Sequence, residues 1–138
     1  ILNGVLFGFF VMFVNGFLSS YGYAGLNMPF QMVGMAIVGV IGAVYGQRMT
    51  QQIKANFCLE TAVIGALSAL IYDLITNVGV GFSYVLAGMN FALAMITAIA
   101  YGTFFSIIHI SSNTAVFGIL TLPSIKILRN LTEVRKNG

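Results

Sequence analysis

The sequence predicts an all-α membrane protein, a compact bundle of about five transmembrane helices. Two observations support this prediction. No Asp, Glu, Lys or Arg occurs from Ile1 to Gln47, and none occurs from Leu74 to Ile125. Charged residues make up 7% of the chain and hydrophobic residues 59%, whereas a soluble domain is about a quarter charged. A surface this apolar would aggregate in water, so most of it must face lipid.

The spans are expected to be helices, because lipid offers no hydrogen-bond partners for open strand edges. A transmembrane barrel would show short segments of alternating hydrophobicity, and this chain has long apolar runs instead. A spanning helix needs about 20 apolar residues. The stretches that reach or approach this length are Ile1–Ser19, Pro29–Gly46, Phe57–Ile75, Ser83–Tyr101 and Ser106–Leu128.

The segments between these stretches differ in character. Ser20–Met28 is rich in Tyr, Gly and Asn, and Gln47–Asn56 is polar and basic. Thr76–Phe82 holds an asparagine and two glycines, which are turn formers. The break at Gly102–Phe105 has the weakest signal. Without it, Leu86–Ile110 forms one long helix, followed by a re-entrant or interfacial piece, and the number of spans falls to four.

Prolines and small residues shape the expected bundle. Pro29 suits a helix start, where its missing N–H costs nothing, and Pro123 should kink the last helix. Small residues recur at four-residue spacing, which lets helix backbones approach closely in lipid. This spacing favours either packing within the bundle or a docking face for a partner membrane protein. The pairs are Gly4/Gly8, Gly42/Gly46, Ala62/Ala66, Gly65/Ala69, Ala94/Ala98 and Ala98/Gly102.

At 138 residues the chain is expected to form a single transmembrane domain. It begins with Ile1 inside an apolar run, so we expect the N-terminal part of the full-length protein to be missing. The one cysteine, Cys58, excludes an internal disulfide.

The net charge of +3 comes from basic residues in two places, and it bears on orientation. Basic residues flank membrane segments on the cytoplasmic side, whereas a nucleic-acid partner would need more of them on a water-facing surface. Five spans would put the two basic places on opposite sides of the membrane, and four spans would put them on the same side. These residues are Arg48 and Lys54 in one loop and Lys126, Arg129, Arg135 and Lys136 near the C-terminus.

The sequence contains no motif of a soluble enzyme. It has no phosphate-binding loop, no paired metal-ligand spacing and no serine elbow. We therefore expect no catalytic residue, no metal and no cofactor. This pattern favours a binding or transport protein over an enzyme.

Polar residues at membrane depth are costly, so each of them needs a reason. Asp73 is either a ligand contact in a cavity or a carboxylate at the interface, where it would be hydrated or cap a loop. His109 and Asn113 are four residues apart and share a face of a continuous helix. They could bind a polar ligand or form an interhelical bond. Gln31 follows Pro29 at a helix start, where free N–H groups favour polar and anionic ligands.

These residues lie at or near the ends of the predicted helices, so we expect them to line one polar-edged cavity. Asn27 is expected to cap a helix, and Asn15 to bond to a neighbouring helix. Glu60 is expected at the membrane interface near Lys54. The predicted substrate-binding residues are Gln31, Tyr72, Asp73, Asn77, His109 and Asn113.

Several stretches resemble the substrate-specific S components of energy-coupling factor (ECF) transporters. The resemblance covers most of the chain and ends with an apolar run and a basic tail. The stretches are Gly16–Ser20, Pro29–Met32, Gly39–Gly42, Gly65–Asp73 and His109–Asn113.

The resemblance implies a compact bundle of about six helices, of which this chain would be a truncated form. It further implies that the protein binds a vitamin or a similar micronutrient or precursor in a prokaryotic plasma membrane. The partners would be a membrane-embedded T component and two ATPase subunits. The alternative from the residues themselves is a structural or assembly subunit of a larger membrane complex, with no ligand of its own.

Overall fold

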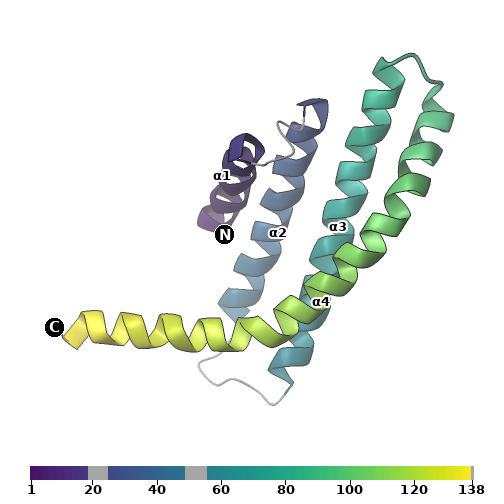
Figure 1. Cartoon of the computed structure of the whole chain (residues 1–138). Coiled ribbons are helices and arrows are strands. Elements are labelled where there is room, and N and C mark those ends of the chain that lie inside the picture. The colour runs from purple at the N-terminus through teal and green to yellow at the C-terminus, as the bar shows by residue number, and fades with distance from the viewer. Residues whose placement is uncertain (19–24, 49–55, 138) are drawn as a thin grey trace.

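A computed structural model describes residues 1–18, 25–48 and 56–137 of the chain. The described residues are helical and contain no strand, which confirms the all-α prediction. Figure 1 shows α2, α3 and the first part of α4 running alongside one another, with α1 next to α2. The elements are α1 (Leu2–Leu18), the short 3₁₀ helix η1 (Gly25–Asn27), α2 (Met28–Arg48), α3 (Phe57–Leu86) and α4 (Phe91–Asn137).

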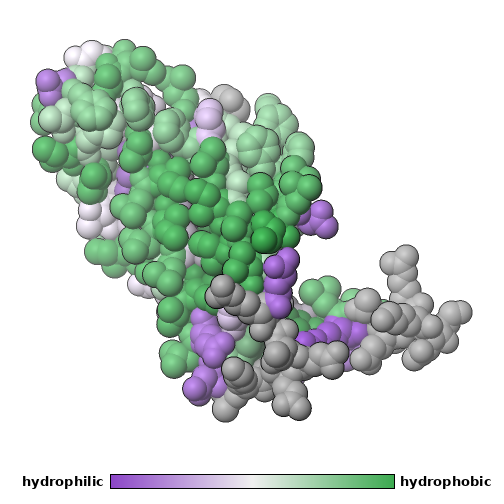
Figure 2. Space-filling view, turned by 180° about the vertical axis from the view of Figure 1, so that it is seen from behind, coloured by the Kyte–Doolittle hydropathy of each residue, from purple (hydrophilic) through white to green (hydrophobic). Residues whose placement is uncertain are grey.

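The helices have the length and composition of membrane spans. Three segments of the described chain are long and apolar enough to cross a bilayer: Gly25–Gln47, Phe57–Leu86 and Phe91–Leu131. The shorter α1 is apolar as well. Figure 2 shows hydrophobic side chains over most of one face, with most of the hydrophilic ones in this view gathered at one end. These features confirm the prediction of a membrane protein, but they do not confirm five spans.

Two of the predicted breaks are wrong. Thr76–Phe82 lies inside α3, and Gly102–Phe105 lies inside α4. A glycine inside a helix costs about 1 kcal/mol relative to alanine, but it leaves room for a neighbouring side chain. A Cβ atom on Gly79 would clash with Asn27 and Phe30, and one on Gly81 would clash with Met95. These glycines therefore act as packing sites and not as turns.

The turn between α3 and α4 occurs instead at residues 87–90, inside the predicted span Ser83–Tyr101, so the bounds of that span are wrong. Gly88 has a φ of +96°, a left-handed conformation that glycine adopts without strain. Asn90 Oδ1 accepts hydrogen bonds from the backbone N–H groups of Ala92 (3.0 Å) and Leu93 (3.5 Å). The side chain of Asn90 thus caps the start of α4.

Small residues bring α1 and α2 into close contact. A Cβ atom on Gly4 would clash with the Gly39 carbonyl oxygen, and one on Gly8 would clash with the Met35 carbonyl oxygen. Backbones this close gain dispersion contacts that larger side chains would prevent. Packing within the bundle is therefore confirmed for this pair of glycines. Gly42 faces open space.

The last helix is too long to lie entirely within a bilayer. At about 1.5 Å per residue its 47 residues extend about 70 Å, against a hydrocarbon core of about 30 Å. Figure 1 shows α4 turning away from α3, so that its C-terminal part lies across one end of the bundle. Pro123 lies in this helix and cannot donate a hydrogen bond to the Ile119 carbonyl, which fits the predicted kink.

The turn in α4 also bears on the distribution of charge. Arg48 ends α2, and Lys126 and Arg129 lie on the C-terminal part of α4, at the same end of the molecule. Lys54 lies outside the described residues. Both basic places are therefore at one end of the bundle, as the four-span alternative requires.

We predict that Gly8→Val separates α1 from α2 and lowers stability. Overpacking a close contact costs about 1–3 kcal/mol, because the new side chain meets the backbone of Met35. The measurement is thermal unfolding of the detergent-purified protein, followed by far-ultraviolet circular dichroism. Gly42→Val is the matched control, because a Cβ atom there has nothing within 4 Å. Equal melting temperatures for the two variants would contradict this packing.

Candidate functional site

A buried contact between α3 and α4 lies at the centre of the candidate site. His109 Nδ1 and Asp73 Oδ1 are 2.7 Å apart, with side-chain exposures of 29% and 4%. When the carboxylate is ionised, the Nδ1–H group of His109 is the donor. A hydrogen bond to a charged group contributes about 1.5–3 kcal/mol, more than one between neutral groups.

The second oxygen of the same carboxylate has no such partner. Asp73 Oδ2 is buried and accepts no hydrogen bond from the residues that the structure describes. A buried acceptor without a donor is costly, so this oxygen is a point at which a donor would stabilise the protein. Asp73 lies near the middle of α3. The alternative of a hydrated or loop-capping carboxylate at the interface is therefore wrong, because the helix continues past the expected break.

Aromatic rings surround the histidine. The ring of Tyr72 meets His109 edge-on at a centroid distance of 5.8 Å, and the ring of Phe105 lies at 5.8 Å in a tilted arrangement. Tyr72 also packs against Gly34 of α2. Its hydroxyl is directed at Met12 Sδ of α1, 3.8 Å away. The side chain of Tyr72 therefore links α3 to the other three α-helices at the level of the buried pair.

A cavity of about 510 Å³, here called the polar cavity, opens between the start of α2, the second half of α3 and the first half of α4. Four of the six predicted site residues line it: Gln31, Tyr72, Asn77 and His109. Asp73 is joined to this wall through its bond to His109. The described residues that line the polar cavity are Asn27, Gln31, Tyr72, Thr76, Asn77, Val80, Tyr84, Ala98, Tyr101, Gly102, Phe105 and His109.

The sixth predicted residue, Asn113, lines a smaller cavity of about 230 Å³. Tyr72 and His109 line this cavity as well, so the two side chains separate it from the polar cavity. The Asn113 amide donates a hydrogen bond to the His109 carbonyl oxygen, at 2.9 Å. His109 and Asn113 share a helix face as predicted. The Asn113 amide is partly satisfied within α4, and it does not reach the polar cavity.

Sequence reasoning missed several residues of the polar cavity. The sequence favours helix capping over a ligand contact for Asn27, yet its Oδ1 is buried and has no hydrogen-bond partner in the described chain. Tyr84 and Tyr101 also line the cavity and are not among the predicted residues. On a continuous α3, Asn77 and Tyr84 share a face, and on a continuous α4 so do Tyr101 and His109. The two wrongly predicted breaks concealed this periodicity.

Two further predictions concern Glu60 and Asn15, and Lys54, the residue expected near Glu60, lies outside the described residues. Glu60 Oε2 accepts a hydrogen bond of 2.9 Å from the Tyr45 hydroxyl at an exposed position near the start of α3. Asn15 is exposed on the outer face of α1, so its expected bond to a neighbouring helix is wrong.

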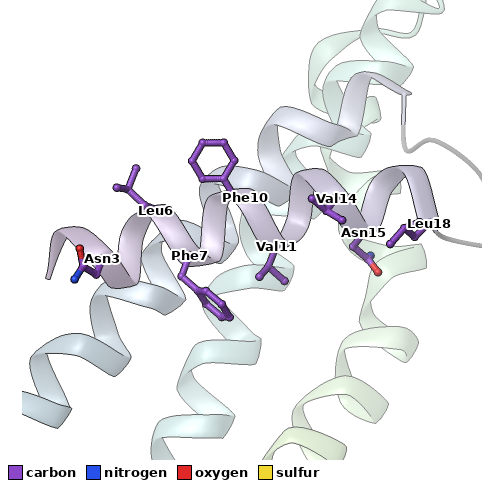
Figure 3. A pocket seen from close by; sticks show the side chains of 8 residues that line it. All are labelled: Asn3, Leu6, Phe7, Phe10, Val11, Val14, Asn15 and Leu18. Atoms are coloured by element: carbon purple, nitrogen blue, oxygen red, sulfur yellow. The ribbon is translucent and has the colours of Figure 1, made fainter.

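A larger hollow, of about 800 Å³, lies on that outer face and not at the buried pair. Figure 3 shows side chains of α1 alone around it, and only Asn3 and Asn15 among them are polar. One helix cannot enclose a ligand, and this face has the composition of a lipid-facing surface. The polar cavity is the better candidate because three helices enclose it.

The chemistry of the polar cavity suits noncovalent binding. Its amide and hydroxyl groups both donate and accept hydrogen bonds, and its tyrosine and phenylalanine rings offer flat apolar surfaces. Binding sites for small molecules combine these features: mostly apolar walls with a few placed polar groups.

No family model, curated protein or solved structure matches this chain. The resemblance to ECF S components therefore rests on the sequence stretches given above and stays a prediction. The geometry of the two cavities is the independent ground for a functional proposal.

We predict that the Asp73–His109 contact stabilises the bundle, and that a double-mutant cycle will show it. His109→Leu leaves both Asp73 oxygens unpaired and should cost about 1–3 kcal/mol of unfolding free energy. Adding Asp73→Leu should restore part of this loss, with a coupling energy of about 1 kcal/mol or more. The measurement is denaturant unfolding in detergent micelles.

The control cycle uses Tyr45→Phe and Glu60→Ala, each of which removes the exposed hydrogen bond at the charged end. Exposed polar pairs contribute about 0–1 kcal/mol, so its coupling should be smaller. A coupling between Asp73 and His109 no larger than that of the control would contradict a stabilising contact.

Proposed function

We propose that this protein is a membrane substrate-binding subunit that holds a small molecule in the polar cavity. The observation that supports this proposal is the set of uncharged polar groups around one cavity in an otherwise apolar bundle. Asn27, Gln31 and Asn77 contribute amides, and Tyr84 and Tyr101 contribute hydroxyls. Polar groups at membrane depth are costly unless they have partners, and a polar ligand would provide them.

Unmet hydrogen-bonding capacity points in the same direction. Asn27 Oδ1, in the wall of the cavity, and Asp73 Oδ2, beside it, are buried acceptors without donors in the described chain. Each such group costs about 1–3 kcal/mol. A ligand with N–H or O–H groups would recover part of this cost at Asn27. The volume of about 510 Å³ lies within the range of about 300–1,000 Å³ that is usual for small-molecule sites.

The position of the cavity suits uptake from outside the cell. Gln31 lies near the start of α2, and Tyr84 near the end of α3. Both ends are opposite the end that holds the basic residues (Figure 1). By the positive-inside rule the basic end faces the cytoplasm. We therefore infer that the cavity opens toward the extracytoplasmic side of a plasma membrane.

The importer type follows from the sequence resemblance alone. In an ECF-type system the substrate would be a vitamin or a similar micronutrient, and a T component with two ATPase subunits would supply the driving force. Transport would come from movement of the whole bundle against these partners. The chain itself would perform no covalent chemistry.

A second candidate is a structural or assembly subunit without a ligand. The Asp73–His109 contact favours it, because this bond joins α3 and α4 without any bound molecule. The two candidates differ in what they require of Gln31. A structural subunit does not need this amide, whereas a binding subunit uses it to contact substrate.

The first test is mass spectrometry of small molecules released from the detergent-purified protein. We expect the wild type to retain a polar molecule, and Gln31→Leu to retain about tenfold less, because loss of one buried hydrogen bond of about 1.4 kcal/mol is tenfold in affinity. Gln47→Leu is the matched control, on the same helix but exposed and outside the cavity. No retained molecule, or equal retention by both variants, would favour the structural subunit.

A second test separates charge from shape at the buried pair. Asp73→Asn keeps the size of the side chain and an acceptor for His109, but removes the anion. If the carboxylate accepts a hydrogen bond from a donor on the substrate, retention should fall about ten- to hundredfold. If Asp73 serves only the bundle, the melting temperature should fall and retention by the folded fraction should not. The same two quantities, retention of the molecule and melting temperature, are measured for His109→Ala and Asn113→Ala.

A further inference from the structure

We propose that residues 124–131 of α4, here called the terminal segment, lie along the membrane surface and bind anionic phospholipid headgroups. This inference is independent of the proposed function. It rests on the length of α4, on the direction that this helix takes, and on the chemistry of the two faces of the segment.

The length of α4 places the terminal segment beyond the hydrocarbon core. Gly118 of α4 lies against Ala62 and Cys58, near the start of α3 at Phe57. The part of α4 from Phe91 to Gly118 therefore already matches almost the full length of α3. That helix, with 30 residues and about 45 Å, exceeds the hydrocarbon thickness of about 30 Å. The residues after Gly118 have passed the hydrophobic part of the bilayer.

The direction of the helix keeps the terminal segment close to the bundle end. Figure 1 shows the yellow-green to yellow part of α4 lying across the end where α2 stops and α3 starts. A helix that continued straight would have entered the water. A helix that turns crosswise lies in the plane of the membrane surface, where an amphipathic helix is most stable.

The terminal segment has an apolar face and a basic face. Ile127, Leu128 and Leu131 are exposed by 59%, 63% and 63%. They occupy one side of the helix, while Lys126 and Arg129 lie three residues apart on the other side. Within the described chain α4 packs against α3 and no other helix. Ile127 and Leu131 therefore keep more than half of their surface exposed.

The charge of the segment selects the occupant. The terminal segment contains two basic residues and no acidic one, and residues 124–137 as a whole contain four basic residues and one acidic residue. Anionic phospholipids attract basic residues beside a membrane helix, and their acyl chains accept an apolar face just below the headgroups. A bilayer that contains anionic lipid thus satisfies both faces at once. A protein partner would have to offer an acidic patch and an apolar groove at the same depth.

The absence of tryptophan from the chain makes a direct test possible. The full chain carrying Leu131→Trp is reconstituted into nanodiscs of phosphatidylcholine, with or without phosphatidylglycerol. Brominated acyl chains then quench the single indole according to its depth. We expect bromine near the headgroups to quench it at least twofold more than bromine near the chain ends. Ile107→Trp, exposed in the middle of α4, should show the opposite order.

The charge requirement is tested in the same discs. Lys126→Gln combined with Arg129→Gln should reduce quenching of the indole at least twofold in discs with phosphatidylglycerol, and raised salt should do the same. Asn130→Gln, an uncharged change on the same segment, should have no effect. Ile127→Trp replaces Leu131→Trp as the reporter if the latter protein does not fold.

If the indole emits as a water-exposed tryptophan does and is not quenched in either membrane, the proposal is overturned. A protein partner would then be the expected occupant of the apolar face. Equal quenching with and without phosphatidylglycerol, unaffected by the two Gln substitutions, would overturn the role of anionic headgroups.

Discussion

The structure depends on one constraint: a polar group inside lipid must find its partner within the protein. The Asp73–His109 contact meets this constraint for one carboxylate oxygen and leaves the other unpaired. Hydroxyl groups along the helices meet it locally. Thr76, for example, donates to the Asp73 carbonyl at 3.1 Å. Within the described chain, the buried side-chain atoms without a hydrogen-bond partner are Asn27 Oδ1, which lines the polar cavity, and Asp73 Oδ2, which lies beside it.

Glycine makes this arrangement possible. A Cβ atom on Gly102 would clash with the Asn77 amide, and one on Gly79 would clash with Asn27 Oδ1. These two glycines create the space in which two amides sit between helices at the edge of the polar cavity. Without Gly102 the helices α3 and α4 would have to separate, and without Gly79 so would α3 and the start of α2, with weaker dispersion contacts in each case. The same small residues thus allow the helices to pack closely and allow the two amides to sit between them.

The sequence predicted the helical membrane class because long charge-free runs have no stable alternative in water. It also selected residues that the fold brings near one another: Gln31, Tyr72, Asn77 and His109 line one cavity. The helix boundaries failed for a physical reason. Gly79 and Gly81 have the same local chemistry as Gly88, but only Gly88 adopts a left-handed conformation. The other two are held in a helix by contacts with distant residues, which local patterns do not contain.

His109 belongs to both the packing and the cavity, so these two properties are physically connected. Its ring bonds to Asp73 on one side, contacts Tyr72 and Phe105, and lines both cavities. A molecule in the polar cavity that displaced this ring would also weaken the bond between α3 and α4. Conversely, a molecule that held the ring in place would tighten the bundle, by an amount set by its differential affinity for the two arrangements. A ligand in the polar cavity would thus change the packing of α3 against α4 through the Asp73–His109 pair.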